Sequence, residues 1–269
     1  FSVACNSSKD AIRIKGSDTE VNVVLLLCEA FFNQQQQQAV SISGGGSGLG
    51  IATLLNGQAD VANSSRPMSE TEKQLFAERK IKVIETEFAQ DALVIITHKD
   101  NPIDSLTLDE LGDILSGNRT YWTKDEKEET RITIYGRQNN SGTHGYLKKK
   151  LGIDFSTNAK EMNGNAQIVE AVKADKTSIG YVGAGYILKD NTLITDDIHL
   201  IRLKADPNTK AYSPLDTNAV EEHRYVLQRP LYQYILQESY KKVRPFLAFE
   251  QSDAGRKIIT SNGYYTITK

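Results

Sequence analysis

The glycine-rich run at residues 43–50, which reads SGGGSGLG, constrains this chain more than any other stretch. Valine and isoleucine alternate with serine just before it, which predicts a strand. After it, Ile51, Leu54 and Leu55 lie at helical spacing, and Asn56-Gly57 ends the helix. Glycines at such a junction let backbone N–H groups approach a ligand, and the amino end of a helix favours an anion. The run predicts an oxyanion site, and a turn that binds nothing is the alternative.

The run lacks the signatures of nucleotide-binding and hydrolase loops. A Walker loop ends in Gly-Lys-Ser/Thr, but no lysine occurs between Lys15 and Lys73. A dinucleotide fingerprint needs glycine at i, i+2 and i+5, and the registers that start at Gly44, Gly46 and Gly48 all lack the last glycine. The Gly-x-Ser-x-Gly pattern of hydrolases fails because Leu49 replaces its second glycine. We therefore expect no cofactor.

The composition narrows the class of protein further. The chain has 269 residues, of which 39% are hydrophobic and 25% charged, as in globular proteins of one large or two ordinary domains. Its net charge of −2 provides no basic surface for nucleic acid. No apolar run reaches the roughly 18 residues of a membrane span. The four histidines have no metal-ligand spacing, and the pair Ser141 and His144 lacks a third orienting group, so we expect neither a metal site nor an enzyme.

The two cysteines suggest different roles. Cys5 follows Phe1-Ser2-Val3-Ala4 and precedes a polar stretch, which resembles the end of a bacterial lipoprotein signal. We expect lipidation at Cys5 and a membrane tether; an ordinary chain terminus is the alternative. Cys28 is predicted to be a core residue, although a disulfide with Cys5 is another interpretation. The face assigned to it on the expected helix contains Val21, Val24, Leu25 and Phe32.

Three strand–loop–helix units follow one another in the first third of the chain. The expected strands at residues 11–14, 40–43 and 59–62 lead into Gly16-Ser17-Asp18-Thr19, the glycine-rich run and Asn63-Ser64-Ser65-Arg66. A capping box at Ser69-Glu70-Thr71-Glu72 opens the helix of the third unit. Such units form parallel sheets, and ligands bind outside the carboxyl ends of their strands. We expect the three polar loops to meet at one edge of the sheet.

The same pattern begins again in the middle of the chain. Residues 91–97 form a buried apolar strand, a helix between Thr107 and Gly117 follows, and the strand at 131–135 opens into Gly136–Thr143. Helices are predicted near residues 240–249 and 253–260. We expect a tether at residues 1–10, a first lobe at 11–90, a second lobe at 91–225, and a return crossing that completes the first lobe at 226–269.

The motifs, taken in order, resemble the periplasmic phosphate-binding proteins of bacterial ABC phosphate transporters, which are type II solute-binding proteins. They are Gly16-Ser17-Asp18-Thr19, Gly46-Ser47-Gly48, Asn63-Ser64-Ser65-Arg66, Arg137-x-x-x-Ser141-Gly142-Thr143, Gly164-Asn165-Ala166, Val169-x-x-Val172, Ile179-Gly180-Tyr181-Val182-Gly183 and Arg229-Pro230-Leu231-Tyr232. The resemblance implies a two-lobe α/β fold. Each lobe is a mostly parallel sheet flanked by helices, two hinge crossings join the lobes, and the ligand lies in the cleft.

The resemblance also implies the phosphate-binding residues. They are Thr19, the backbone N–H of Glu20, Ser47, Ser65, Arg137, Ser141, Gly142 and Thr143. A dehydrated dianion needs many hydrogen-bond donors, and arginine, hydroxyl groups and helix-start N–H groups supply them. The implied function is high-affinity binding of inorganic phosphate outside the cytoplasmic membrane and delivery to an ABC transporter permease by a lipid-anchored monomer. Binding of another oxyanion, such as sulfate, is the alternative.

One position departs from the family pattern. Many members have aspartate where this chain has Ser65, and that aspartate accepts the proton of the phosphate. Ser65 can donate or accept a hydrogen bond, so it can serve hydrogen phosphate, but it lacks the charge that repels a fully ionised sulfate. Asp18 or Glu20 could supply the acceptor or could cap the first helix. Arg66 could contact the ligand or pair with Asp18 or Glu20.

Overall fold

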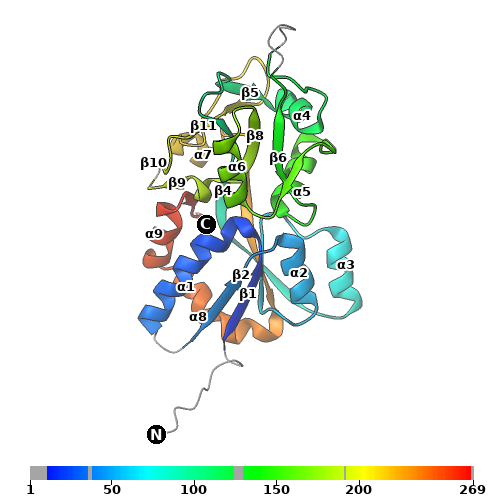
Figure 1. Ribbon diagram of the computed structural model, residues 1–269. Coiled ribbons are helices and arrows are strands. Elements are labelled where there is room, and N and C mark those ends of the chain that lie inside the picture. The colour runs from blue at the N-terminus through cyan, green and yellow to red at the C-terminus, as the bar shows by residue number, and fades with distance from the viewer. Residues whose placement is uncertain (1–10, 36–37, 124–129, 191, 268–269) are drawn as a thin grey trace.

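The structure is a computed structural model that describes residues 11–35, 38–123, 130–190 and 192–267. It consists of a lower and an upper lobe, which the long strands β4 (Val83–His98) and β13 (Gln228–Leu236) connect (Figure 1). The main sheet has the order β2-β1-β3-β13-β4-β8-β6-β7, so β13 and β4 lie at its centre. The two-lobe α/β fold expected from the motifs is confirmed.

The lower lobe contains the three predicted strand–loop–helix units. Strand β1 lies between β2 and β3 and is parallel to both. The strands are β1 (Ile12–Gly16), β2 (Val40–Ser43) and β3 (Val61–Ser64), and the helices are α1 (Val21–Gln35), α2 (Ser47–Leu55), α3 (Glu70–Glu78), α8 (Tyr240–Glu250) and α9 (Asp253–Ser261). Short 3-10 turns η1 (Asp18–Glu20) and η3 (Gln237–Ser239) precede α1 and α8. The prediction of two closing helices is also confirmed.

The upper lobe is built on the second part of β4, which pairs with β8 and β11. Strand β6 is parallel to β8 and to β7. The strands are β5 (Ser105–Thr107), β6 (Thr133–Arg137), β7 (Lys160–Met162), β8 (Ser178–Gly183), β9 (Leu188–Lys189), β10 (Thr192–Leu193), β11 (Ile198–Leu200) and β12 (Arg202–Lys204). The helices are α4 (Leu108–Ser116), α5 (Gly142–Leu151), α6 (Asn165–Ala174), the turn η2 (Ala184–Tyr186) and α7 (Thr217–Glu221), and β14 (Tyr264–Tyr265) pairs with β4.

The predicted helix ends agree with the structure. Ser69 and Glu72 form a reciprocal capping box at the start of α3, and Thr107 and Glu110 form another at the start of α4. Each box satisfies two backbone N–H groups that the first turn would otherwise leave unpaired. Gly117 ends α4 in the left-handed conformation at φ 83°, which glycine adopts without steric cost.

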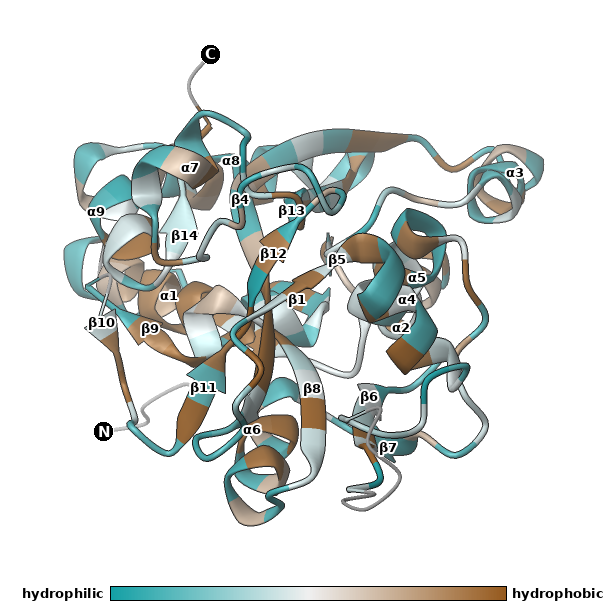
Figure 2. Cartoon of the chain, turned by 90° about the horizontal axis from the view of Figure 1, so that it is seen from above, coloured by the Kyte–Doolittle hydropathy of each residue, from teal (hydrophilic) through white to brown (hydrophobic). Residues whose placement is uncertain are grey.

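Along each of the two crossing segments, the buried residues pass from the hydrophobic core of one lobe to that of the other. In β4, Ala89 packs in the core of the lower lobe and Ala92 in that of the upper lobe. In the return crossing, Leu227 belongs to the upper core and Leu231 to the lower core. Hydrophobic stretches of β4, β8 and β11 lie side by side when the molecule is viewed from above (Figure 2). We propose that these changes mark the lobe boundaries, close to the expected limits at 90 and 225.

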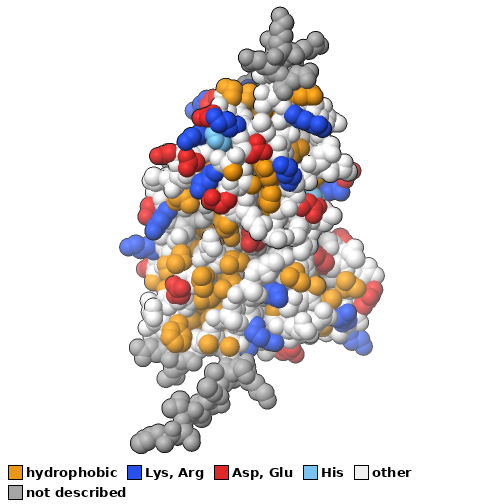
Figure 3. All heavy atoms as spheres, in the orientation of Figure 1, with side chains coloured by type: hydrophobic (Ala, Val, Ile, Leu, Met, Phe, Trp, Pro, Cys, Tyr) orange, Lys and Arg blue, Asp and Glu red, His pale blue; other side chains and the backbone are white. Residues whose placement is uncertain are grey.

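Helix α1 shows one error in the predicted apolar face. Its buried side chains include Val24, Leu27 and Phe31, whereas Leu25 and Phe32 are 45% and 52% exposed. Exposed hydrophobic side chains gather over this part of the lower lobe (Figure 3). The phase was ambiguous because residues 21–32 are apolar on nearly every side of the helix, so packing against α8 and α9 decides it.

The cysteine predictions are only partly open to comparison with the structure. Cys28 is a free thiol that is 6% exposed, and burial raises its pKa to about 12, in agreement with a core role. Cys5 and the proposed tether lie outside the described residues. No helix in the described part of the chain is long and apolar enough to cross a membrane.

A buried carboxyl group on α8 predicts a pH dependence of stability. Gln233 Nε2 donates to Glu250 Oε1 at 3.0 Å, and burial raises the pKa of Glu250 to about 8. The unfolded chain loses this proton near pH 4.3, at about the ordinary glutamate pKa. Between these two values the folded state holds the additional proton, so the free energy of unfolding decreases as the pH rises, by at most ~1.4 kcal/mol per pH unit.

We expect Glu250→Gln to flatten this dependence and to raise the melting temperature relative to the original chain at pH 8. Thermal melts followed by circular dichroism between pH 5 and pH 8 measure the effect. Glu238→Gln, at an exposed position, is the matched control and should leave the slope unchanged. Parallel pH profiles for the original chain and Glu250→Gln would contradict the assignment.

Candidate functional site

The glycine-rich run sits, as predicted, between β2 and the start of α2. Gly46 precedes the helix at φ 100°, a conformation that L side chains rarely adopt. Gly50 faces β1 so closely that a Cβ there would lie 2.5 Å from Gly16 Cα. The N–H of Gly46 donates to Gly16 O, and that of Gly48 donates to Asn140 O in the upper lobe. These two N–H groups therefore hold the loop in place, and Ser47 remains as its polar side chain at the helix start.

Ser47 and Ser65 bring two of the three lower-lobe loops together. Both serines are at most 1% exposed, and the N–H of Ser65 donates to Ser47 Oγ at 3.1 Å. Because Ser47 Oγ accepts this bond, its own proton can be donated elsewhere. The two hydroxyl oxygens are 3.5 Å apart.

The start of α5 in the upper lobe closes directly onto these serines. A Cβ at Gly142 would lie 2.2 Å from Ser47 Oγ and 2.4 Å from Ser65 Oγ, so only glycine fits at this contact. Ser141 caps the helix and accepts the N–H of His144, while the first N–H groups of the helix have no partner within it. The predicted residues Ser141, Gly142 and Thr143 are all buried. They lie at the amino end of α5, where an anion is favoured.

A buried arginine that the sequence analysis did not assign to the site joins the two lobes. Arg229 Nη2 donates to Thr19 Oγ1 at 3.3 Å and to Thr143 Oγ1 at 3.0 Å. The two threonine oxygens, one from each lobe, are 3.2 Å apart. Arg229 also forms an ion pair with Asp91 at 2.8 Å, in which both side chains are at most 1% exposed. In the sequence, Arg229 stands out only through the motif Arg229-Pro230-Leu231-Tyr232, and the register that places it opposite Asp91 on paired strands appears only in the structure.

Arg137 lies at the end of β6 and is 3% exposed. Its Nη1 donates to Asp18 Oδ2 at 3.1 Å and its Nη2 to Asn163 O at 3.2 Å, while its buried Nε has no hydrogen-bond partner in the described structure. Burial lowers the pKa of Arg137 and the Asp18 carboxylate opposes this shift, so the guanidinium stays charged. Arg137 thus keeps its Nε–H available to a ligand in a buried site.

Two of the interpretations left open by the sequence are corrected. Asp18 does not cap the first helix, because its carboxylate accepts hydrogen bonds from Arg137 and Asn165 of the upper lobe. Arg66 pairs with Glu72 at 2.7 Å, so its pairing with Asp18 or Glu20 is wrong. Glu72 accepts hydrogen bonds from the Arg66 guanidinium and from the backbone N–H of Ser69, the first residue of the capping box of α3.

Glu20 is buried completely below the site. Burial raises the pKa of its carboxyl group well above the usual range, which favours the neutral form. Its N–H makes a bond of 3.3 Å to Ser17 O, within the turn η1. Its role as a backbone donor to the ligand stays a prediction.

The charges of the site are balanced before a ligand is added. Arg137 faces Asp18, and Arg229 faces Asp91, so each cation has a carboxylate partner. Capture of an anion must then depend on hydrogen-bond donors rather than on net positive charge. No group of three or more metal-ligating side chains occurs among the described residues.

The family model of the PBP superfamily domain matches residues 4–254. The chain belongs to the PBP superfamily. It is 28% identical over 268 residues to the phosphate-binding protein PstS of Pseudomonas aeruginosa. This match covers 93% of the present chain and 80% of that protein. It is 27% identical over 250 residues to the phosphate-binding protein PstS of Staphylococcus haemolyticus, with coverage of 90% and 77%. The resemblance inferred from the motifs is confirmed.

Solved structures of phosphate-transport proteins have the same fold. A putative phosphate ABC transporter substrate-binding protein with bound phosphate from Clostridium perfringens is 24% identical, with a TM-score of 0.82 over 96% of this chain and 100% of that one. An ABC-type phosphate transport receptor from Vibrio cholerae is 25% identical, with a TM-score of 0.72 over 95% and 100%.

The contact at Gly142 predicts that one added methyl group at this position would keep the lobes from closing fully. In Gly142→Ala, the added carbon would overlap two hydroxyl oxygens of the opposite lobe. We expect a larger radius of gyration than for the original chain in small-angle X-ray scattering. Gly112→Ala is the matched control, since a Cβ there meets Ile153 at an ordinary 3.6 Å. Equal radii for the two variants would contradict this closed contact.

Proposed function

We propose that this chain binds inorganic phosphate outside the cytoplasmic membrane and delivers it to the permease of an ABC transporter. The observation that carries the proposal is the convergence of hydroxyl groups, helix-start N–H groups and Arg137 from two lobes on one buried place. The named relatives, phosphate-binding proteins PstS, support the choice of phosphate among oxyanions.

The proposed ligands are those implied by the motifs. Thr19, Glu20, Ser47 and Ser65 act from the lower lobe, and Arg137, Ser141, Gly142 and Thr143 act from the upper lobe. Phosphate enters an open cleft and stabilises the closed form because only that form offers both sets of donors. The closed form then docks on the permease. We propose that the protein is a monomer tethered through a lipid on Cys5, and that it catalyses no reaction.

Selectivity is proposed to depend on hydroxyl groups. The Asp18 and Asp91 carboxylates are each paired with an arginine, so neither presents an unpaired negative charge to the ligand. Ser65 Oγ, near the start of α5, is the proposed acceptor, because a hydroxyl group can accept one bond and donate another. Sulfate has no proton to donate, so it leaves this acceptor without a partner. The loss disfavours sulfate binding less than the negative charge of a carboxylate at this position would.

Isothermal titration calorimetry with phosphate and with sulfate tests the proposed ligand. We expect tight phosphate binding and weaker sulfate binding at pH 6 and at pH 8. The sulfate signal should still be measurable at high concentration, because no unpaired carboxylate repels it. Tight binding of sulfate without binding of phosphate would overturn the proposal, as would the absence of heat with either anion.

The charged donor provides a second test. We expect Arg137→Ala to weaken phosphate binding by roughly a hundredfold, since a charge-assisted hydrogen bond contributes about 1.5–3 kcal/mol and the variant also leaves Asp18 without its counter-charge. Arg202→Ala is the matched control, because Arg202 is an exposed residue paired with Asp104. An affinity of Arg137→Ala within a few-fold of the original value would contradict the role of Arg137.

A further inference from the structure

Asp18 belongs to the lower lobe, but the hydrogen-bond donors to its carboxylate in the described structure belong to the upper lobe. Its Oδ2 accepts hydrogen bonds from Arg137 Nη1 at 3.1 Å, from the backbone N–H of Asn165 at 2.8 Å and from Asn165 Nδ2 at 2.6 Å. Its backbone carbonyl accepts a bond from the Tyr186 hydroxyl group at 2.6 Å. These four bonds connect one residue at the start of η1 to three separate segments of the other lobe.

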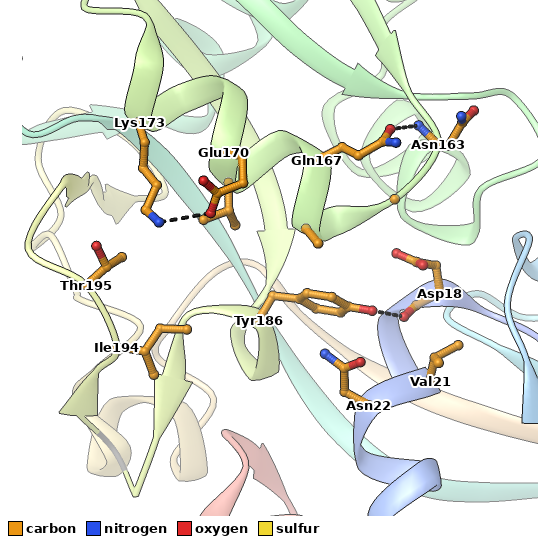
Figure 4. Close-up of a pocket in the computed structure, with 13 residues that line it drawn as sticks. Asp18, Val21, Asn22, Asn163, Gln167, Glu170, Lys173, Tyr186, Ile194 and Thr195 are labelled. Carbon is orange, nitrogen blue, oxygen red and sulfur yellow. Dashed lines mark hydrogen bonds and ion pairs between the residues drawn. The ribbon is translucent and has the colours of Figure 1, made fainter.

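Figure 4 shows the place of these contacts at the edge of the cleft. The hydroxyl group of Tyr186 points at the backbone of Asp18, and the Asp18 carboxylate is directed toward the start of α6. The space beside them is a cavity of about 620 Å³ between the two lobes. Asp18 thus lies where the lobes meet, between that cavity and Arg137.

The carboxylate performs the task of a helix cap across the cleft. Helix α6 has Gly164 before its first residue and therefore no side-chain cap of its own. A Cβ at Gly164 would lie 3.2 Å from Asp18 Oδ1, so the small residue permits the close approach. A carboxylate at this position satisfies an unpaired N–H and interacts favourably with the helix dipole. The cap is present only when the lobes are closed.

We propose that Asp18 is a positioning residue that latches the two lobes over the bound anion and orients Arg137 toward it, without contacting the anion. The proposal rests on the phosphate-binding function proposed above. Opening of the cleft separates Asp18 from all four partners and leaves the buried Arg137 without its counter-charge. Because a largely desolvated, hydrogen-bonded charge pair acts mainly on dissociation, the latch slows the release of the ligand.

The first experiment measures release and association separately. Radiolabelled phosphate bound to Asp18→Asn is chased with unlabelled phosphate in a rapid-filtration assay. We expect release to be faster by about tenfold or more and association to change less than about threefold. Asp197→Asn is the matched control, because Asp197 forms an exposed ion pair with Lys99 inside the upper lobe. Unchanged release would overturn the latch.

The second experiment exchanges the two side chains of the latch. Asn165→Asp places a second carboxylate 2.6 Å from Asp18 Oδ2, so like charges repel and we expect release faster than in Asp18→Asn. In the double variant Asp18→Asn/Asn165→Asp, an amide faces a carboxylate again, with the roles exchanged. We expect slower release than in Asn165→Asp alone. A general loss of structure would not be rescued by the exchange, so a double variant that is no slower would overturn the proposal.

The third experiment reports closure without relying on phosphate binding. Spin labels on cysteines at Ala77 of α3 and Lys149 of α5, both exposed, measure the distance between the lobes by double electron–electron resonance. Cys5 is replaced by serine, and buried Cys28 stays unlabelled because burial raises its pKa to about 12. We expect Asp18→Asn to populate longer distances than the unsubstituted background.

The distances separate the two proposals. A background protein whose distances and calorimetry do not respond to phosphate would refute the phosphate-binding function. In that case the ligand-free distances of Asp18→Asn and the background still decide on the latch. Identical distributions in the two proteins, with and without phosphate, would overturn it.

Discussion

The ion pair between Arg229 and Asp91 is the interaction on which the site depends. It joins the two crossing strands at the place where the core changes lobes, and both side chains are almost fully buried. A buried pair of this kind is costly to desolvate unless its remaining groups are hydrogen-bonded. Arg229 Nη2 donates to Thr19 and Thr143, and Asp91 accepts the N–H of Ala184, so most of the pair's remaining groups are hydrogen-bonded; Arg229 Nη1 is buried without a partner among the described residues. The pair thereby fixes one hydroxyl group from each lobe next to the hinge.

The same principle of internal balance extends through the site. Arg137 is matched by Asp18, as Arg229 is by Asp91, and Glu20 is kept toward its neutral form by burial. Because each arginine of the site has a carboxylate partner, the lobes can close without leaving an unbalanced positive charge in the site. It still favours an anion, because hydroxyl groups and helix-start N–H groups lose their water when the lobes meet. The proposed selectivity then depends on Ser65 Oγ as the acceptor of the hydrogen bond that hydrogen phosphate donates.

Much of this arrangement could be predicted from local patterns. Capping boxes at Ser69 and Thr107, and the strand–loop–helix units, are encoded by residues three or four positions apart. The loops with Ser47, Ser65 and Ser141–Thr143 can be recognised from the sequence, because each places hydroxyl or glycine residues between a strand and a helix, where an anion is favoured. The face of α1 could not be predicted, since an almost uniformly apolar helix has no unique periodicity.

The sequence by itself determined the α/β units, the helix starts and the list of groups able to bind an anion, because each depends on neighbours along the chain. Only the tertiary structure decided how those groups are paired. Asp18 meets Arg137 and Asn165, and Arg229 meets Thr19 and Thr143, across separations of 86 to 210 residues. Such pairings arise when two lobes close on each other, and no periodicity or spacing in one segment specifies the partner of a charge that lies in the other.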